Sequence, residues 1–178
     1  VAGYGFPHVN MDLIAGLPAD TPEGFRRSLD RCLAFGTDNV TVHTLALKKG
    51  SRILLEGLPI PGPEDVAAML DYAAPALRKA GYSPYYLYRQ KYMSGSFENT
   101  GWCRPGYTGL YNIYMMEELH TILSLGGGGM NKINLPAEKL ARYHNPKIPQ
   151  DYISRIDTIL QQKDEIFSLL RQIREQNP

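Results

Sequence analysis

The chain lacks closely spaced cysteines, an excess of basic over acidic residues and a long apolar run. Only two of its 178 residues are cysteines, Cys32 and Cys103, too far apart in sequence for a local metal motif. The formal net charge of +1 argues against a general nucleic-acid binder, which shows a strong basic excess. No apolar run approaches the ~20 residues that cross a bilayer, and residues 1–5 do not resemble a signal peptide. We therefore expect a cytoplasmic protein that binds neither nucleic acid nor membranes.

The first 47 residues predict a strand, a helix and a second strand. Val9–Pro18 reads as an apolar strand, and Asn39–Leu47 reads as another. Between them Thr21 is a suitable N-cap, Pro22 suits the first helical position, and Gly36 is placed to end the helix. Short links between these elements predict two parallel strands joined by a right-handed crossover.

An aspartate stands inside the first strand. Asp12 interrupts the apolar sequence VNMDLIAGLP, and a buried carboxylate costs several kcal/mol unless it has a partner. We expect Asp12 to be buried and close to the end of the second strand, where His43, Thr44 and Ala46 follow one another. Polar groups at adjacent strand ends predict a ligand site, although Asp12 could instead cap a loop or pair with a structural arginine.

The remaining elements are expected in a fixed order along the chain. A helix begins at Pro63 and is kinked or split at Pro75, and a strand covers Tyr82–Tyr92. An irregular connection spans residues 94–109, and a helix covers Tyr111–Leu125. A long amphipathic helix closes the chain from Asp151 to about Glu175, with Lys163 on its exposed side. Its expected apolar stripe consists of Ile153, Ile156, Leu160, Phe167 and Leu170, flanked by Ile159, Ile166 and Ile173.

Aromatic and basic residues are concentrated in the middle of the chain. Eight of the twelve tyrosines fall between Tyr82 and Tyr114, interleaved with Arg89 and Lys91. This combination could stack on single-stranded RNA, form one face of a packed sheet, or hold a flat anionic ligand. The low net charge disfavours RNA. Lys48 lies in a polar loop with Gly50 and Ser51, which is typical of a solvated, solubilising segment.

Four segments together resemble a known family. They read NMDLIAGLPADT, NVTVHTLALKKGS, YYLYRQKYM and EELHTILSLGGGGMNK, and they cover almost the whole chain. They resemble the oxygen-independent coproporphyrinogen III oxidases of the radical S-adenosylmethionine superfamily, most closely the Gram-positive branch known as coproporphyrinogen dehydrogenases. The resemblance implies an α/β fold: residues 1–84 would be the C-terminal half of a partial (β/α) barrel, and residues 85–178 an α+β region with a long terminal helix.

The resemblance also implies roles for individual residues. Asp12, Ala46 and Met130 match positions at bound S-adenosylmethionine, and Met130 follows the glycine run Gly126–Gly129. The intact protein would convert coproporphyrinogen III to protoporphyrinogen IX in haem synthesis, turning two propionates into vinyl groups. Basic residues would then meet the substrate propionates: Lys48, Arg89, Lys91 and Arg104. No catalytic acid, base, nucleophile or metal ligand is assigned to this chain.

The family's CxxxCxxC loop, which binds a 4Fe-4S cluster, is missing from the sequence. We therefore expect a C-terminal fragment that is inactive alone and whose missing N-terminal part carries the cluster. A degenerate paralogue without a cluster is the competing explanation. Two other functions stay open: a haem-binding or haem-transfer relative without oxidase activity, and an interaction module that reuses the fold.

Overall fold

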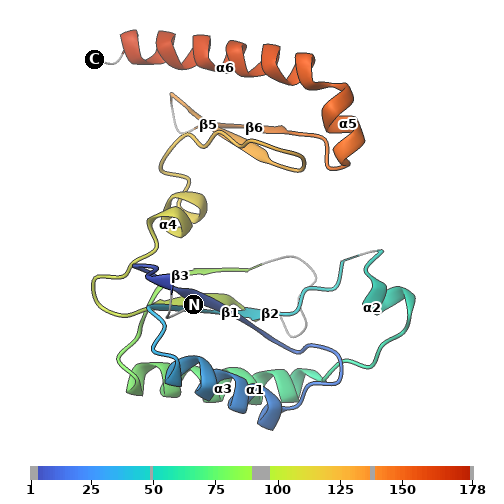
Figure 1. The fold of residues 1–178 in the computed structure, drawn as a ribbon, viewed down its shortest axis with the longest axis vertical. Helices are drawn as coiled ribbons and strands as arrows, with labels where there is room; N and C mark the ends of the chain where they lie inside the picture. Colours follow the sequence, from blue (N-terminus) through green and yellow to red (C-terminus); the bar gives the residue numbers. More distant parts are fainter. Residues whose placement is uncertain (1–3, 49, 90–96, 137–138, 177–178) are drawn as a thin grey trace. The chain divides into compact units, whose positions relative to one another are not determined.

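The computed structural model describes residues 4–48, 50–89, 97–136 and 139–176. The chain divides into two compact units, residues 1–110 and residues 111–178, which we call the N-terminal unit and the C-terminal unit (Figure 1). Lys91, one of the predicted substrate contacts, lies outside the described residues. Among the residues described, no helix combines the length and apolarity needed to cross a membrane.

The N-terminal unit begins with the predicted strand, helix and strand. Strands β1 (Asn10–Ala15) and β2 (Asn39–Thr44) are parallel, and helix α1 (Pro22–Ala34) connects them. The Thr21 hydroxyl accepts a hydrogen bond from the Gly24 amide at 3.1 Å and caps α1, as predicted. The side chains of β1 alternate, so that one set faces α1 and the other faces away from the helices.

Two helices cover one face of this sheet. Helices α1 and α3 (Pro63–Lys79) lie side by side beneath it, and the short helix α2 (Arg52–Leu55) stands in the connection before α3 (Figure 1). Helix α3 continues through Pro75, which excludes a split there and leaves the kink as the remaining prediction. The core between helices and sheet buries apolar side chains worth about 1.5–3 kcal/mol each when fully buried. Its largest members are Tyr82, Phe25, Leu29, Met69 and Leu77.

A strand that the sequence did not predict completes the sheet. Strand β4 (Asn99–Cys103) lies between β2 and β3 (Ser83–Tyr88), antiparallel to both, and gives the order β1-β2-β4-β3. The predicted irregular connection over residues 94–109 is therefore wrong at its centre. Within β4, Trp102 is buried against the helix side, while Gly101 leaves space for the ring of Tyr86 on the face away from the helices.

We predict that Gly101→Ala destabilises the N-terminal unit by at least about 1 kcal/mol, because the added methyl group would overlap the Tyr86 ring. The free energy of unfolding in urea checks this. The double variant Gly101→Ala/Tyr86→Ala is the control, since removing the ring makes room for the methyl group. The overlap argument fails if the alanine at position 101 costs as much with the ring absent as with the ring present.

The C-terminal unit is built on a two-stranded hairpin. Strands β5 (Met130–Leu135) and β6 (Lys139–His144) are antiparallel, and Met130 pairs with His144. Helix α4 spans only Leu110–Met116, so the predicted helix over Tyr111–Leu125 is too long. The backbone of Glu118 has a φ of 52°, outside the helical region, and Ile122 forms a β-bridge with Lys132. Residues after Met116 therefore extend toward the hairpin.

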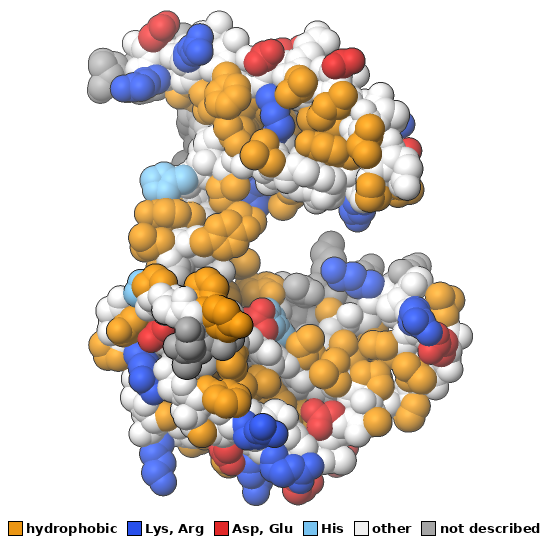
Figure 2. All heavy atoms as spheres, in the orientation of Figure 1, with side chains coloured by type: hydrophobic (Ala, Val, Ile, Leu, Met, Phe, Trp, Pro, Cys, Tyr) orange, Lys and Arg blue, Asp and Glu red, His pale blue; other side chains and the backbone are white. Residues whose placement is uncertain are grey.

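The terminal helix differs from its predicted form in two ways. It is divided at Arg155 into α5 (Pro149–Ser154) and α6 (Ile156–Gln176). The predicted apolar stripe is not the buried face: Leu160 is 52% exposed and Phe167 is 47% exposed. The buried positions of α6 are Ile159, Ile166 and Lys163, so the placement of Lys163 on the exposed side is wrong. Figure 2 shows hydrophobic side chains among charged ones on the surface of these helices.

The predicted division at residues 84 and 85 describes the family architecture and stays a prediction. Along the sequence, the boundary between the two compact units falls between residues 110 and 111. It lies beyond residue 85 because β3 and β4 pair within the sheet of the N-terminal unit.

Candidate functional site

A groove of about 470 Å³ opens where β1 and β2 end. Ligand sites of α/β sheets lie in this position, outside the carboxyl ends of parallel strands. Ala46, which follows β2, contributes to the lining, and so does Ile14 of β1. The polar and charged residues of this strand-end groove are Asp12, His43, Thr44, Lys48, Ser51, Tyr88 and Asn99.

Asp12 is exposed, so its predicted burial is wrong. Its side chain is 59% exposed, because the alternation of β1 turns it away from α1 and α3. The Asn10 amide donates a hydrogen bond to Asp12 Oδ1 at 2.7 Å, and His43 Nε2 lies 3.6 Å from Oδ2. The predicted proximity of Asp12 and Ala46 is confirmed, since both line the strand-end groove. The groove therefore presents a carboxylate to its solvent-filled space.

His43 lies between Asp12 and Tyr88. Its Nδ1 atom is 3.3 Å from the Tyr88 hydroxyl, and the two rings meet edge to face. When Nε2 carries the proton that faces Asp12, Nδ1 accepts the hydrogen bond from Tyr88. Contacts to both ring nitrogens hold the His43 side chain in place.

Polar and aromatic side chains continue from the groove across the face of the sheet away from the helices. The Thr41 hydroxyl lies 3.3 Å from Asn10 Oδ1 and 3.4 Å from the Tyr86 hydroxyl. Tyr86 stacks parallel to Tyr88, and burial raises the pKa of the Tyr86 phenol above its ordinary value. The sequence showed the tyrosine concentration, but it gave no signal that Gly101 seats one ring beside Thr41.

Two buried hydroxyl oxygens in the lining residues have no hydrogen-bond partner within the described part of the chain. They belong to Thr44 and Ser51. Thr44 has the same strand parity as Val40 and Val42, which places its side chain with the core residues. Ser51 follows the strand in the loop before α2 and is only partly buried as a residue. Ser51 contributes to the lining of the groove, and its hydroxyl oxygen is a buried group with unused hydrogen-bonding capacity among the described residues.

The predicted basic residues are not all brought to the groove. Lys48 lines it. Arg89 forms an exposed ion pair with Glu98, with 3.1 Å between guanidinium and carboxylate, and is not part of the lining. Arg104 follows β4, whose end pairs with Asn39 at the start of β2. The structure therefore places Arg104 at the opposite end of the sheet, because β4 was not predicted and runs antiparallel to β2.

The glycine run Gly126–Gly129 lies in the C-terminal unit, and several of its backbone groups bond to neighbouring segments. The Gly128 amide donates to the Pro146 carbonyl at 2.7 Å, and the Asn145 amide donates to the Gly129 carbonyl at 2.8 Å. The Asn145 side chain also donates to the Gly126 carbonyl at 2.8 Å. Half-buried Met130 follows at the start of β5. These hydrogen bonds hold the backbone of the glycine run in place immediately before Met130.

Lys163 holds the other side of this segment. Its ammonium donates to the Ser124 carbonyl at 2.7 Å and to Asn131 Oδ1 at 3.1 Å. The Ser124 amide donates to the same Asn131 oxygen at 2.9 Å. Both Lys163 and Asn131 are buried, and the structure shows no carboxylate partner for Lys163 among the residues it describes.

One carboxylate in the C-terminal unit is paired with two cations. Hydrogen bonds from Lys132 and Arg142 hold the pKa of Glu118 below its ordinary value.

The two cysteines are buried free thiols, Cys32 on α1 and Cys103 on β4. Across the ranges that the structure describes, no group of three or more His, Cys, Asp or Glu residues is arranged to hold a metal ion.

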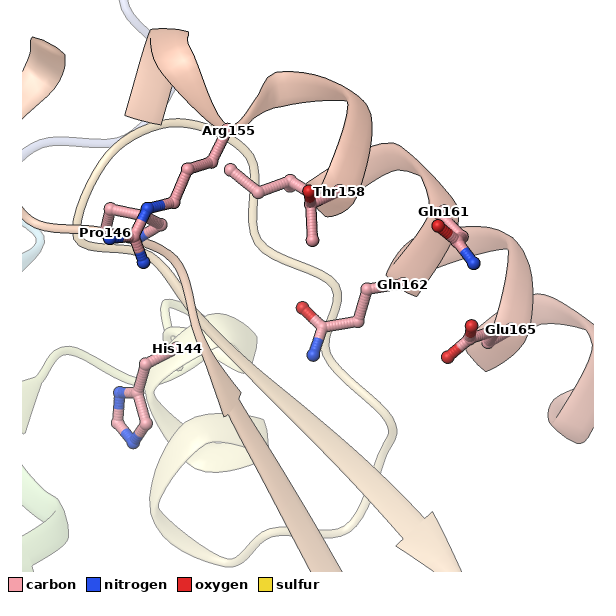
Figure 3. Close-up of a pocket in the computed structure, with 8 residues that line it drawn as sticks. His144, Pro146, Arg155, Thr158, Gln161, Gln162 and Glu165 are labelled. Carbon is pink, nitrogen blue, oxygen red and sulfur yellow. The ribbon is translucent and has the colours of Figure 1, made fainter. Parts of the chain in front are cut away.

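A second hollow, of about 370 Å³, lies in the C-terminal unit between the end of β6 and helix α6 (Figure 3). Arg155 extends toward Pro146, while Glu165 stands at the far end (Figure 3). None of the predicted site residues lines this hollow.

Comparison with known proteins gives consistent results. No protein-family model matches the chain. It is 38% identical over 175 residues to the "oxygen-independent coproporphyrinogen-III oxidase-like protein HemZ" of Bacillus subtilis, covering 97% of this chain and 34% of that protein. It is 37% identical over 83 residues to the oxygen-independent coproporphyrinogen III oxidase of Helicobacter pylori, covering 44% of this chain and 18% of that enzyme.

Two further similarities extend this result. The heme chaperone HemW of Mycobacterium tuberculosis is 30% identical over 106 residues, which is 57% of this chain and 24% of the chaperone. The structure of the radical SAM enzyme coproporphyrinogen III oxidase (HemN) from Escherichia coli aligns with a TM-score of 0.61 at 21% identity, over 88% of this chain and 36% of that one. This alignment shows the predicted fold, the C-terminal part of a partial (β/α) barrel followed by an α+β region.

The chain spans about a third, or less, of the length of these relatives. Its similarity to them extends from the strand of Asp12 into the terminal helix, since 97% of its residues align with the Bacillus protein. The chain therefore belongs to the oxygen-independent coproporphyrinogen III oxidase family of radical S-adenosylmethionine proteins and corresponds to part of its C-terminal region.

Proposed function

We propose that the strand-end groove forms part of the S-adenosylmethionine site of a coproporphyrinogen III oxidase. One observation carries this proposal: Asp12 of β1 and Ala46, which follows β2, are the residues that the family resemblance assigns to that cofactor, and they line one groove. The Asp12 carboxylate can accept hydrogen bonds from ribose hydroxyls or face the positive sulfonium. The side chain of Ala46 is a single methyl group, so a ligand in the groove can approach the backbone closely at this position.

The groove fits such a cofactor in size and in chemistry. Its volume of about 470 Å³ is within the range of small-molecule sites. The buried Ser51 hydroxyl lacks a protein partner among the described residues, and a polar ligand would supply one. Met130 is proposed as a further, apolar contact. When bound at its cluster, the cofactor supplies the radical chemistry of the family. The residues of this chain would bind and orient it, and the 4Fe-4S cluster would have its ligands outside this chain.

The proposed substrate is coproporphyrinogen III, whose propionates require cations. Lys48 is the best-placed candidate, because it lines the strand-end groove. Arg89 follows Tyr88 of the groove, but its pair with Glu98 would have to open before it could bind a propionate. We retain Lys91 and Arg104 as weaker proposals, since Lys91 is outside the described residues and Arg104 is at the other end of the sheet.

A haem-handling function is the second candidate. The similarity to the Mycobacterium heme chaperone favours it. The groove also contains His43 and Tyr88, whose side chains are both able to ligate haem iron. The proposal of an interaction module without a cluster has no comparable support in the groove.

Turnover and haem titration separate these functions. The product of the complete gene, with its cluster reconstituted and S-adenosylmethionine supplied as the oxidant, is expected to release carbon dioxide from coproporphyrinogen III and to form vinyl products under anaerobic conditions with a reductant for the cluster. This chain alone is expected to be inactive in the same assay. Stoichiometric haem binding without turnover would overturn the oxidase proposal in favour of haem handling. Binding of neither haem nor S-adenosylmethionine would favour an interaction module.

A further inference from the structure

We infer that Ser51 and Lys48 form a carboxylate-binding subsite at one end of the strand-end groove. The inference rests on the proposed function and deepens it, because it names the ligand group that these two residues hold. Ser51 has no role in the reasoning from sequence, and the structure alone identifies it.

The first argument is the hydrogen-bonding state of Ser51. Its Oγ atom is buried and has no partner within the described residues. Ser51 is also the residue before helix α2, a position where serine commonly caps the helix, yet its side chain makes no cap hydrogen bond. A buried hydroxyl that has no hydrogen-bond partner destabilises the folded protein. A ligand in the groove that bonds to this hydroxyl would remove that cost.

The second argument is the local fold that joins the two residues. The Ser51 amide donates to the Lys48 carbonyl at 3.0 Å, and Gly50 has a φ of 82°, a conformation that favours glycine. This hydrogen bond folds the chain so that Lys48 and Ser51 both line the groove. The turn therefore places a residue with a hydroxyl and a residue with an ammonium in the lining of one groove.

The charges in the lining decide which ligand group fits. An ammonium only donates hydrogen bonds, and the Ser51 hydroxyl can donate too, so the pair favours an anionic acceptor. No ion pair is present for Lys48 in the described part of the chain. Asp12 supplies a negative charge to the same groove. A groove with one carboxylate and one ammonium suits a ligand that carries both charges.

Two sources of the carboxylate are compatible with the proposed function. One is the amino-acid carboxylate of S-adenosylmethionine, and the other is a propionate of the tetrapyrrole. The shared chemistry is a carboxylate that accepts hydrogen bonds from a hydroxyl and an ammonium. The experiment below separates the two sources.

The first arm compares two nucleosides on the reconstituted full gene product. S-adenosylhomocysteine carries the amino-acid carboxylate, and 5′-methylthioadenosine lacks it. We expect Ser51→Ala and Lys48→Gln each to weaken S-adenosylhomocysteine binding about tenfold in calorimetry and to leave 5′-methylthioadenosine binding unchanged. Arg52→Gln is the control, because Arg52 is exposed and pairs with Glu56. This pattern supports the cofactor carboxylate.

The second arm compares coproporphyrin with coproporphyrin whose propionates are esterified. Weaker binding of the free acid to Ser51→Ala and Lys48→Gln, with the ester and S-adenosylhomocysteine unaffected, supports the propionate source. Far-ultraviolet circular dichroism checks that each variant is folded. Unchanged binding of all four ligands to both variants overturns the subsite. If Asp12→Asn still weakens S-adenosylhomocysteine binding, the proposed function survives that result; if Asp12→Asn also has no effect, the proposed function fails with it.

Discussion

Asp12→Asn is expected to weaken S-adenosylmethionine binding to the reconstituted full gene product by about tenfold or more, the cost of losing one charge-assisted hydrogen bond. The variant keeps the shape of the side chain and removes its negative charge. Stability should change little, because Asp12 is 59% exposed and its partners Asn10 and His43 are near the surface. Calorimetry measures the affinity, and thermal unfolding measures the stability.

Asp71→Asn is the matched control for this prediction. Asp71 is exposed on α3, on the side of the sheet away from the groove, so the same chemical change there should leave affinity unaltered. Equal affinity of Asp12→Asn and the unmodified protein would end the proposed role of Asp12. A loss of affinity accompanied by unfolding would mean that Asp12 acts through the fold rather than through the ligand.

Lys163→Met is expected to destabilise the C-terminal unit by about 1–3 kcal/mol, the cost of leaving buried acceptors without their donor. Lys163 is 8% exposed, and its ammonium binds the Ser124 carbonyl and Asn131 Oδ1. Methionine is similar in length and removes the charge, so the variant tests these two bonds rather than the volume of the side chain. Hydrogen exchange of amides in residues 124–133 reports the loss locally.

The control for Lys163 lies on the same helix. Arg171 is exposed on α6, and Arg171→Met should leave exchange in residues 124–133 unchanged. The competing contribution is the cost of burying an ammonium that has no carboxylate partner among the described residues, which a methionine avoids. Unchanged or increased stability of Lys163→Met would show that this cost exceeds the value of the two hydrogen bonds.

The sequence predicted the elements whose signals are local. Thr21, Pro22 and Gly36 marked the limits of α1, and the apolar runs on either side marked the two parallel strands. The topology of that unit then placed Asp12 and Ala46 at adjacent strand ends, which the structure confirms. These predictions succeeded because helix caps and a short crossover leave few alternative arrangements.

The failures depend on contacts between segments distant in sequence. Strand β4 was missed because Gly101 lowers its strand propensity, and only the ring of Tyr86 explains that glycine. Lys163 was placed on the exposed side because the hairpin that contacts α6 decides which face is buried. Burial of Asp12 was expected from its apolar neighbours, whereas strand alternation turns it to the opposite face.

Ser51 could not have been found from the sequence. Serine before a helix is an ordinary cap residue, and only the coordinates show that its hydroxyl makes no cap bond and lies in a groove. The polar row of Thr41, Tyr86 and His43 was likewise visible only once the strand register was known. Binding groups that come from separate strands require the tertiary structure to be recognised.

Hydrogen exchange with and without S-adenosylmethionine tests the central claim most directly. On the reconstituted full gene product, the cofactor should slow amide exchange in residues 43–51, which include His43, Ala46 and Ser51 of the groove. Exchange in helix α3, on the other side of the sheet, should stay the same. Saturating cofactor that leaves residues 43–51 unprotected would contradict the claim that the strand-end groove binds it.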